Sequence, residues 1–113
     1  IKVQETSSGR YLECELRVTS EEKNTVVNIA PSGTKIFNQD NLTEHHATTV
    51  NISDVTVSRN WATKQLISDT PVSSTITFEP DEPIDVIAKL QIRFLVKDLG
   101  EIYVDFKDIF VER

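Results

Sequence analysis

The sequence is short of several residue types, and each shortage excludes a class of structure. Cys14 is the only cysteine among 113 residues, so no internal disulfide can form and packing alone must hold the fold together. Three glycines are too few for the glycine-rich loops that bind nucleotide phosphates. No apolar run approaches the ~18 residues of a membrane-spanning helix. No transmembrane span is therefore expected in this segment.

Basic residues are also in the minority. There are 12 Lys and Arg residues against 18 Asp and Glu residues, which gives a net charge of −6. Because proteins bind nucleic acid by neutralising its phosphates, this balance argues against nucleic acid as a partner. Methionine is absent, and aromatic residues make up only 7%. The core must therefore come mainly from Val, Ile, Leu and Phe, and the β-branched members of this set favour strands.

Apolar and polar residues alternate with a period of two in four segments, at residues 11–18, 74–78, 89–97 and 101–106. Successive side chains of a strand point to opposite faces, so each segment is predicted to be a strand with one face in the core. The side chains expected to face inward are Leu12, Cys14, Leu16, Val18, Ile76, Phe78, Leu90, Ile92, Phe94, Val96, Ile102, Val104 and Phe106.

Shorter strands and the turns between them complete the pattern. Weaker strands are expected at residues 2–5, 25–30, 35–37, 46–52 and 55–57. Turn-forming residues separate them, including residues 7–9 and 31–33. Residues 98–100 predict a tight turn between the last two long strands, with Gly100 supplying positive φ. A change in the parity of apolar positions near Lys107 and Asp108 predicts a bulge or a break.

Helix is expected to be nearly absent. Residues 61–67 are compatible with one helical turn, which the following Asp69-Thr70-Pro71 sequence would end. Short strands at this spacing, separated by such turns, are typical of a β-sandwich or a small barrel, and we favour an antiparallel two-sheet β-sandwich. The sequence therefore predicts an all-β fold of about 7–9 strands without a disulfide, formed by one domain over residues 1–113.

His45 and His46 are the first candidates for a site, because imidazole is a common general base and metal ligand. In a strand, adjacent side chains point to opposite faces, so the two rings cannot hold one ion together. Glu44 and His46 share a face, but a metal site would need further ligands from distant sequence. We expect no metal site here and keep both histidines as possible ligand contacts.

No pattern of catalytic residues is present. Cys14 lies on the inward face of its strand, where a free cysteine behaves as a small apolar side chain and not as a reactive thiolate. The chain has no Gly-x-Ser-x-Gly sequence that would present a serine nucleophile. We therefore expect no enzyme activity, no catalytic residue and no cofactor.

Two other features leave alternatives open. Glu79, Asp81, Glu82 and Asp85 surround two prolines, and four oxygen donors so close together are compatible with Ca²⁺ as well as with an ordinary acidic loop. Trp61 is a possible ligand contact if it is exposed, where it would anchor a glycan or a peptide. The other reading of Trp61 is a plug at one end of the core.

The order of the segments resembles that of telokin-like, immunoglobulin-like domains of bacterial exported proteins and lipoproteins. The segments that carry this resemblance are residues 11–18, 26–29, 34–41, 48–52, a loop containing Trp61, residues 66–67 and 71–72, residues 75–80, and the terminal hairpin that ends at residues 104–109. The resemblance covers nearly the whole chain. It implies a sandwich of seven to nine strands, an envelope or extracellular setting and no enzymatic activity. With one cysteine, the inter-sheet disulfide of antibody domains is missing.

These observations lead to one functional hypothesis and one alternative. The first is a noncatalytic interaction or structural domain, extracytoplasmic or envelope-associated, that contacts a protein partner by a sheet face or an exposed edge strand. A cytoplasmic location stays open. The alternative is a carbohydrate-binding module in which Trp61, with Tyr11 or Tyr103, forms an exposed platform for a glycan.

Overall fold

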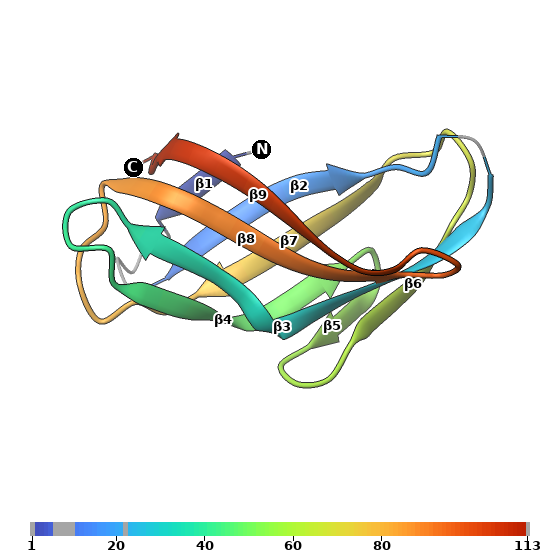
Figure 1. The fold of residues 1–113 in the computed structure, drawn as a ribbon, viewed down its shortest axis with the longest axis horizontal. Coiled ribbons are helices and arrows are strands. Elements are labelled where there is room, and N and C mark those ends of the chain that lie inside the picture. The colour runs from blue at the N-terminus through green and yellow to red at the C-terminus, as the bar shows by residue number, and fades with distance from the viewer. Residues whose placement is uncertain (1, 6–10, 22, 113) are drawn as a thin grey trace.

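The computed structural model describes residues 2–5, 11–21 and 23–112, with only the backbone of Lys2. These residues form nine β-strands and no helix, which confirms the all-β prediction (Figure 1). The predicted turn at residues 7–9 lies outside the described residues. The strands are β1 (Lys2–Glu5), β2 (Leu12–Val18), β3 (Thr25–Asn38), β4 (Glu44–Ile52), β5 (Val55–Val57), β6 (Ala62–Leu66), β7 (Val72–Phe78), β8 (Val86–Val96) and β9 (Gly100–Phe110).

The strands form one curled sheet in the order β1-β2-β7-β4-β3-β8-β9, with β5 beside β4 and β6 beside β3. All pairs of strands are antiparallel. β4 changes neighbours along its length. Its first residues, including His45, pair with β3, whereas the residues from Ala47 onward pair with β7. This change connects the two halves of the curled sheet, which enclose the core (Figure 1).

The two ends of the curled sheet meet at one point. Gln4 of β1 and Glu112, which follows β9, form a parallel bridge. The Glu112 amide donates to the Val3 carbonyl and the Glu5 amide donates to the Glu112 carbonyl, both at 2.9 Å. In Figure 1, β1 and the end of β9 lie side by side.

The prediction of a turn at residues 31–33 is wrong, because β3 continues through them as a single strand. The neighbours of β3 change here from β6 to β4, and its pairing with β8 is irregular between Ala30 and Lys35. Gly33 has a positive φ of 87°. The hydroxyl of buried Thr34 donates to the Ala30 carbonyl and accepts the Arg93 amide, so it replaces the interrupted strand pairing.

Residues 61–67 also differ from their prediction. Residues 62–66 form strand β6 instead of a helical turn, and β6 pairs with the first residues of β3. Ala62 and Leu66 at its two ends are buried. Pairing with β3 and burial of these two side chains decide the conformation of a segment whose local sequence pattern is weak.

The hairpin of β8 and β9 has the predicted turn, with φ of 83° at Gly100. The parity change near Asp108 is also present. Asp108 has a φ of 54°. Ile109 and Val111, which follow it in the sequence, pack against the core. The prediction of a bulge or a break is wrong, because the register of β8 and β9 continues without a shift. The positive φ of Asp108 reorients the strand instead, without an inserted residue.

The expected inward-facing side chains fall into two groups. Those that are buried are Leu12, Cys14, Ile76, Phe78, Leu90, Ile92 and Phe94. Those that are only half-buried, although they pack against the same core, are Leu16, Val18, Val96, Ile102, Val104 and Phe106. The second group comes from the end of β2, the end of β8 and from β9, so the core is incompletely covered on one side.

Candidate functional site

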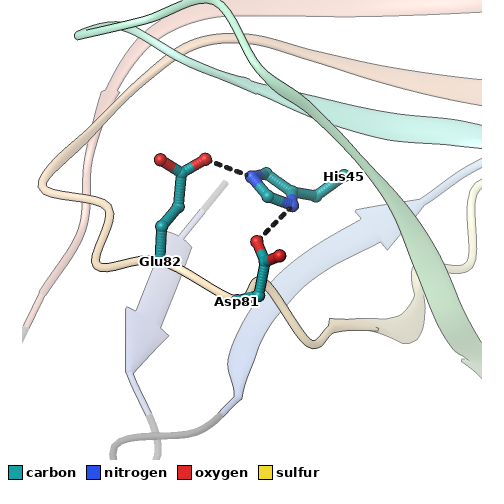
Figure 2. A group of neighbouring side chains, drawn as sticks. All are labelled: His45, Asp81 and Glu82. Carbon is teal, nitrogen blue, oxygen red and sulfur yellow. Dashed lines mark hydrogen bonds and ion pairs between the residues drawn. The ribbon is translucent and has the colours of Figure 1, made fainter.

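The molecule has two candidate sites. One is a cluster of polar side chains, and the other is a cleft at the surface. The first is the His45 cluster, which consists of His45, Asp81 and Glu82 (Figure 2). His45 lies near the start of β4, and the two carboxylates lie in the loop between β7 and β8. His45 Nε2 is 2.6 Å from Glu82 Oε2, and His45 Nδ1 is 4.0 Å from Asp81 Oδ1. The His45 side chain is 10% exposed, whereas that of Asp81 is 94% exposed.

Glu82 is held from more than one side. Its second oxygen, Oε1, accepts a hydrogen bond of 2.6 Å from the Asn41 amide, and Asn41 in turn accepts the Thr43 backbone amide. These hydrogen bonds, from Asn41 first and then from His45 and Asn38, lower the pKa of the Glu82 carboxyl below its usual range. The cluster therefore ties the loop between β7 and β8 to the turn between β3 and β4.

The geometry of the His45 cluster favours a structural role over metal binding. Its three candidate ligand atoms lie within 4.8 Å of one another. However, Asp81 and Glu82 approach different nitrogens of the His45 ring (Figure 2). In this arrangement, an ion bound to one ring nitrogen is not shared by both carboxylates. Glu82 is already engaged through both oxygens. Among the described residues no other group of metal-ligand type comes together.

The other acidic and histidine residues considered as metal ligands do not join the His45 cluster. Glu44 forms an ion pair of 3.0 Å with Lys35, and His46 is exposed on the opposite side of β4 from His45. Of the four acidic loop residues considered for Ca²⁺, only Asp81 and Glu82 join the cluster. The partner of His45 could not be found from the sequence, because it lies 37 residues away.

Trp61 is partly exposed, and one face of its ring is occupied. The Arg93 guanidinium lies 4.8 Å from the ring centroid and also binds Glu101 at 3.0 Å. Tyr103 is the partner of Arg93 in the β8–β9 register and is 48% exposed. Its hydroxyl and the Arg93 guanidinium both bind Glu101 and lower the pKa of that carboxyl. Tyr11 lines a different hollow, of about 500 Å³, between Glu5 and the acidic loop.

The second candidate site is the β2–β9 cleft, which is defined by Leu16, Val18, Ile102, Val104 and Phe106. Two hollows follow each other along these strands. One, of about 660 Å³, lies among Leu16, residues 73–75 and Phe106. The other, of about 320 Å³, lies among Val18, Ile102 and Val104 and is predominantly apolar. The cleft is where the half-buried part of the core reaches the surface.

The backbone edges beside the cleft are unpaired in the described part of the chain. β1 pairs with β2 over residues 12–15, so residues 16–18 have no strand beyond them there. β9 pairs with β8 alone, apart from the single bridge that follows it. Such edges present backbone donors and acceptors to an incoming strand. Phe110, also on β9, is 74% exposed.

Comparisons with known proteins give no relative for this arrangement. No protein-family profile, no curated protein and no solved structure matches the chain. The described residues include no helix that is long and apolar enough to cross a membrane. Function must therefore be inferred from the two candidate sites alone.

Proposed function

We propose that the chain is a noncatalytic protein-interaction domain that contacts its partner through the edge formed by β9 and the end of β2. The observation that carries this proposal is the β2–β9 cleft. There, side chains that the strand pattern points inward remain partly exposed, and the backbone edges beside them pair with no further strand among the described residues. Natural proteins usually cover or interrupt such an edge, and an edge that is left open is suited to strand addition.

The candidate catalytic groups support a role without chemistry. Burial raises the pKa of the Cys14 thiol to about 12, which leaves almost no thiolate at neutral pH. His45 is held between two carboxylates, and no hydroxyl or thiol is hydrogen-bonded to it among the described residues. We interpret this histidine-carboxylate pair, which has no side-chain nucleophile beside it, as a structural contact between β4 and the loop before β8. We propose accordingly that the protein is not an enzyme and needs no cofactor.

The finer description of the fold is part of the same proposal. We interpret the curled sheet as an immunoglobulin-like sandwich. One layer would hold β1, β2, β7 and the second half of β4, and the other would hold β6, β3, β8 and β9. The antiparallel pairing of β1 with β2, together with its parallel bridge beside β9, supports this interpretation. An exported or envelope-associated location, as in the bacterial domains it resembles, is proposed with it.

The carbohydrate-binding alternative is less well supported. A glycan platform requires an open aromatic face, and Arg93 covers one face of Trp61. Tyr103 offers a partly exposed second ring near the same arginine. Titration of Trp61 fluorescence with a panel of oligosaccharides tests this alternative, and a saturable change in emission would favour it over protein binding.

Selection of binding peptides tests the leading proposal. A displayed library of random linear peptides is panned on the immobilised chain, and enriched sequences are synthesised and titrated in solution. We expect peptides that bind with micromolar affinity, since extended segments bound by strand addition gain both backbone hydrogen bonds and side-chain contacts. If repeated selections yield no peptide that binds in solution, the proposed function is wrong.

A further inference from the structure

The two ring nitrogens of His45 face different carboxylates, Glu82 at Nε2 and Asp81 at Nδ1 (Figure 2). We propose that the His45 cluster is a pH-sensitive contact, in which uptake of a proton at Nδ1 brings Asp81 onto the ring. Near neutral pH, Glu82 alone holds the ring. In mildly acidic solution both carboxylates hold it, and the loop between β7 and β8 is attached to β4 at two residues instead of one.

The hydrogen on the neutral ring belongs to Nε2. This nitrogen lies 2.6 Å from Oε2 of Glu82, a distance that requires a hydrogen between the two atoms. Hydrogen bonds from Asn41 first and then from His45 lower the pKa of the Glu82 carboxyl, so the ionised carboxylate has no proton to donate. The imidazole must therefore be the donor. A neutral imidazole has only one N–H group, so its Nδ1 carries a lone pair.

Nδ1 faces Asp81 but is too far from it for a hydrogen bond. Oδ1 of Asp81 is 4.0 Å from Nδ1, whereas N–H···O bonds extend to about 3.2 Å. A lone pair and a carboxylate repel each other, so the neutral ring gives Asp81 no reason to approach. A proton on Nδ1 turns this repulsion into a charge-assisted hydrogen bond. The Asp81 side chain is 94% exposed, so no packing prevents it from closing the gap.

The charges around His45 do not oppose this added proton. In β3 the residue opposite His45 is Ile36, which is buried and uncharged. The neighbouring lysine of β3, Lys35, pairs with Glu44 at 3.0 Å, and His46 lies on the opposite side of β4 from His45. The other described titratable side chains of the adjoining turn, loop and hollow are Asp40, Glu79, Asp85, Glu5 and Tyr11. No cation is among them, and acidic neighbours favour a charged imidazole.

Proton uptake changes how firmly the loop between β7 and β8 is held. Glu82 already connects this loop to β4 and, through Asn41, to the turn between β3 and β4. A second contact at Asp81 fixes the residue next to it. Asp81 and Glu82 also line the hollow of about 500 Å³ beside Tyr11, so one wall of this hollow becomes more rigid. Histidine is the side chain that changes charge between about pH 8 and pH 5, so the response lies in this range.

Nuclear magnetic resonance of the imidazole nitrogens tests where the protons are. The His45 signals are assigned with His46→Gln, which removes the only other histidine at an exposed position. At about pH 8 we expect a hydrogen on Nε2 alone, and at about pH 5 hydrogens on both nitrogens. A ring that carries its hydrogen on Nδ1 at the higher pH would overturn the proposal. So would a ring that is still neutral at the lower pH.

The second test removes the charge of Asp81. Asp81→Asn keeps the size of an exposed side chain and is expected to lower the proton affinity of the His45 ring by about twofold to fivefold, the range of an exposed ion pair. In the wild type, the backbone order parameters of Asp81 and Glu82 should rise between about pH 8 and pH 5. In Asp81→Asn this rise should disappear.

Glu79→Gln is the matched control, because it removes another carboxylate of the same loop that forms no ion pair with His45. This variant is expected to titrate and to respond to pH as the wild type does. Equal proton affinity of the ring in Asp81→Asn and wild type would overturn the role of Asp81. Loop order parameters that are the same at both pH values in the wild type would overturn the pH-sensitive contact.

Discussion

β8 and β9 have nearly the same sequence pattern but very different surroundings. Both are 11 residues long, alternate apolar and polar side chains, and pair with each other along their whole length. Leu90 and Ile92 of β8 are fully buried, whereas Ile102 and Val104 of β9 are half-buried. β8 has a strand on both sides, and β9 is an edge. The number of neighbouring strands, and not the pattern itself, therefore decides how much of an amphipathic strand is buried.

Replacement of a central β8 residue should have the largest effect. Ile92→Ala is expected to lower the free energy of unfolding by about 2–5 kcal/mol, because the side chain is fully buried and the cavity cannot collapse completely. Urea denaturation followed by Trp61 fluorescence measures this loss. A change below about 0.5 kcal/mol would mean that β8 is not the packed centre of the fold.

The same substitution on β9 sharpens the comparison. Ile102→Ala should cost less than half as much as Ile92→Ala, about 1 kcal/mol, because the Ile102 side chain is only partly buried. The two variants are compared under identical denaturation conditions. Equal losses would show that β9 is covered in solution, for instance by a second copy of the chain.

Two glycines beside this pair of strands provide a matched test of backbone strain. Gly33 and Gly100 both have positive φ, but a Cβ at Gly33 would lie 2.7 Å from Cδ of Arg93, while nothing lies near Gly100. Gly100→Ala should cost about 1 kcal/mol from strain alone. Gly33→Ala should cost more and also alter Trp61 fluorescence, because Arg93 must move from the indole ring. Unaltered fluorescence would contradict this coupling.

The smallest effect concerns the loop that leads into β8. The pKa of Glu82 is lowered in the folded state, so its hydrogen bonds stabilise the fold above the ordinary carboxyl pKa. This stabilisation is lost as the pH falls through the lowered value. Denaturation midpoints of wild type and Glu82→Gln should therefore converge at low pH and differ near neutrality. A constant difference at all pH values would exclude the carboxylate as the cause.

The sequence alone predicted the strands with strong alternation, the turn at Gly100 and the parity change near Asp108, since these depend on local residue types. It also placed His45 and His46 on opposite faces. It could not predict that His45 binds Glu82, because the two residues meet only when β4 and the loop before β8 are brought together. Likewise, residues 31–33 and 61–67 were misassigned because strand pairing with distant residues overrides weak local preference.

What the sequence determined by itself is which side of each strand is apolar, because that follows from side-chain alternation within one segment. What only the tertiary structure decided is which apolar sides are fully covered. Burial depends on neighbours supplied by distant parts of the chain, and among the described strands β9 lacks the second neighbour that β8 has in β3. The cleft that carries the proposed function is therefore invisible in the alternation of β9 and is created by its position at the edge of the sheet.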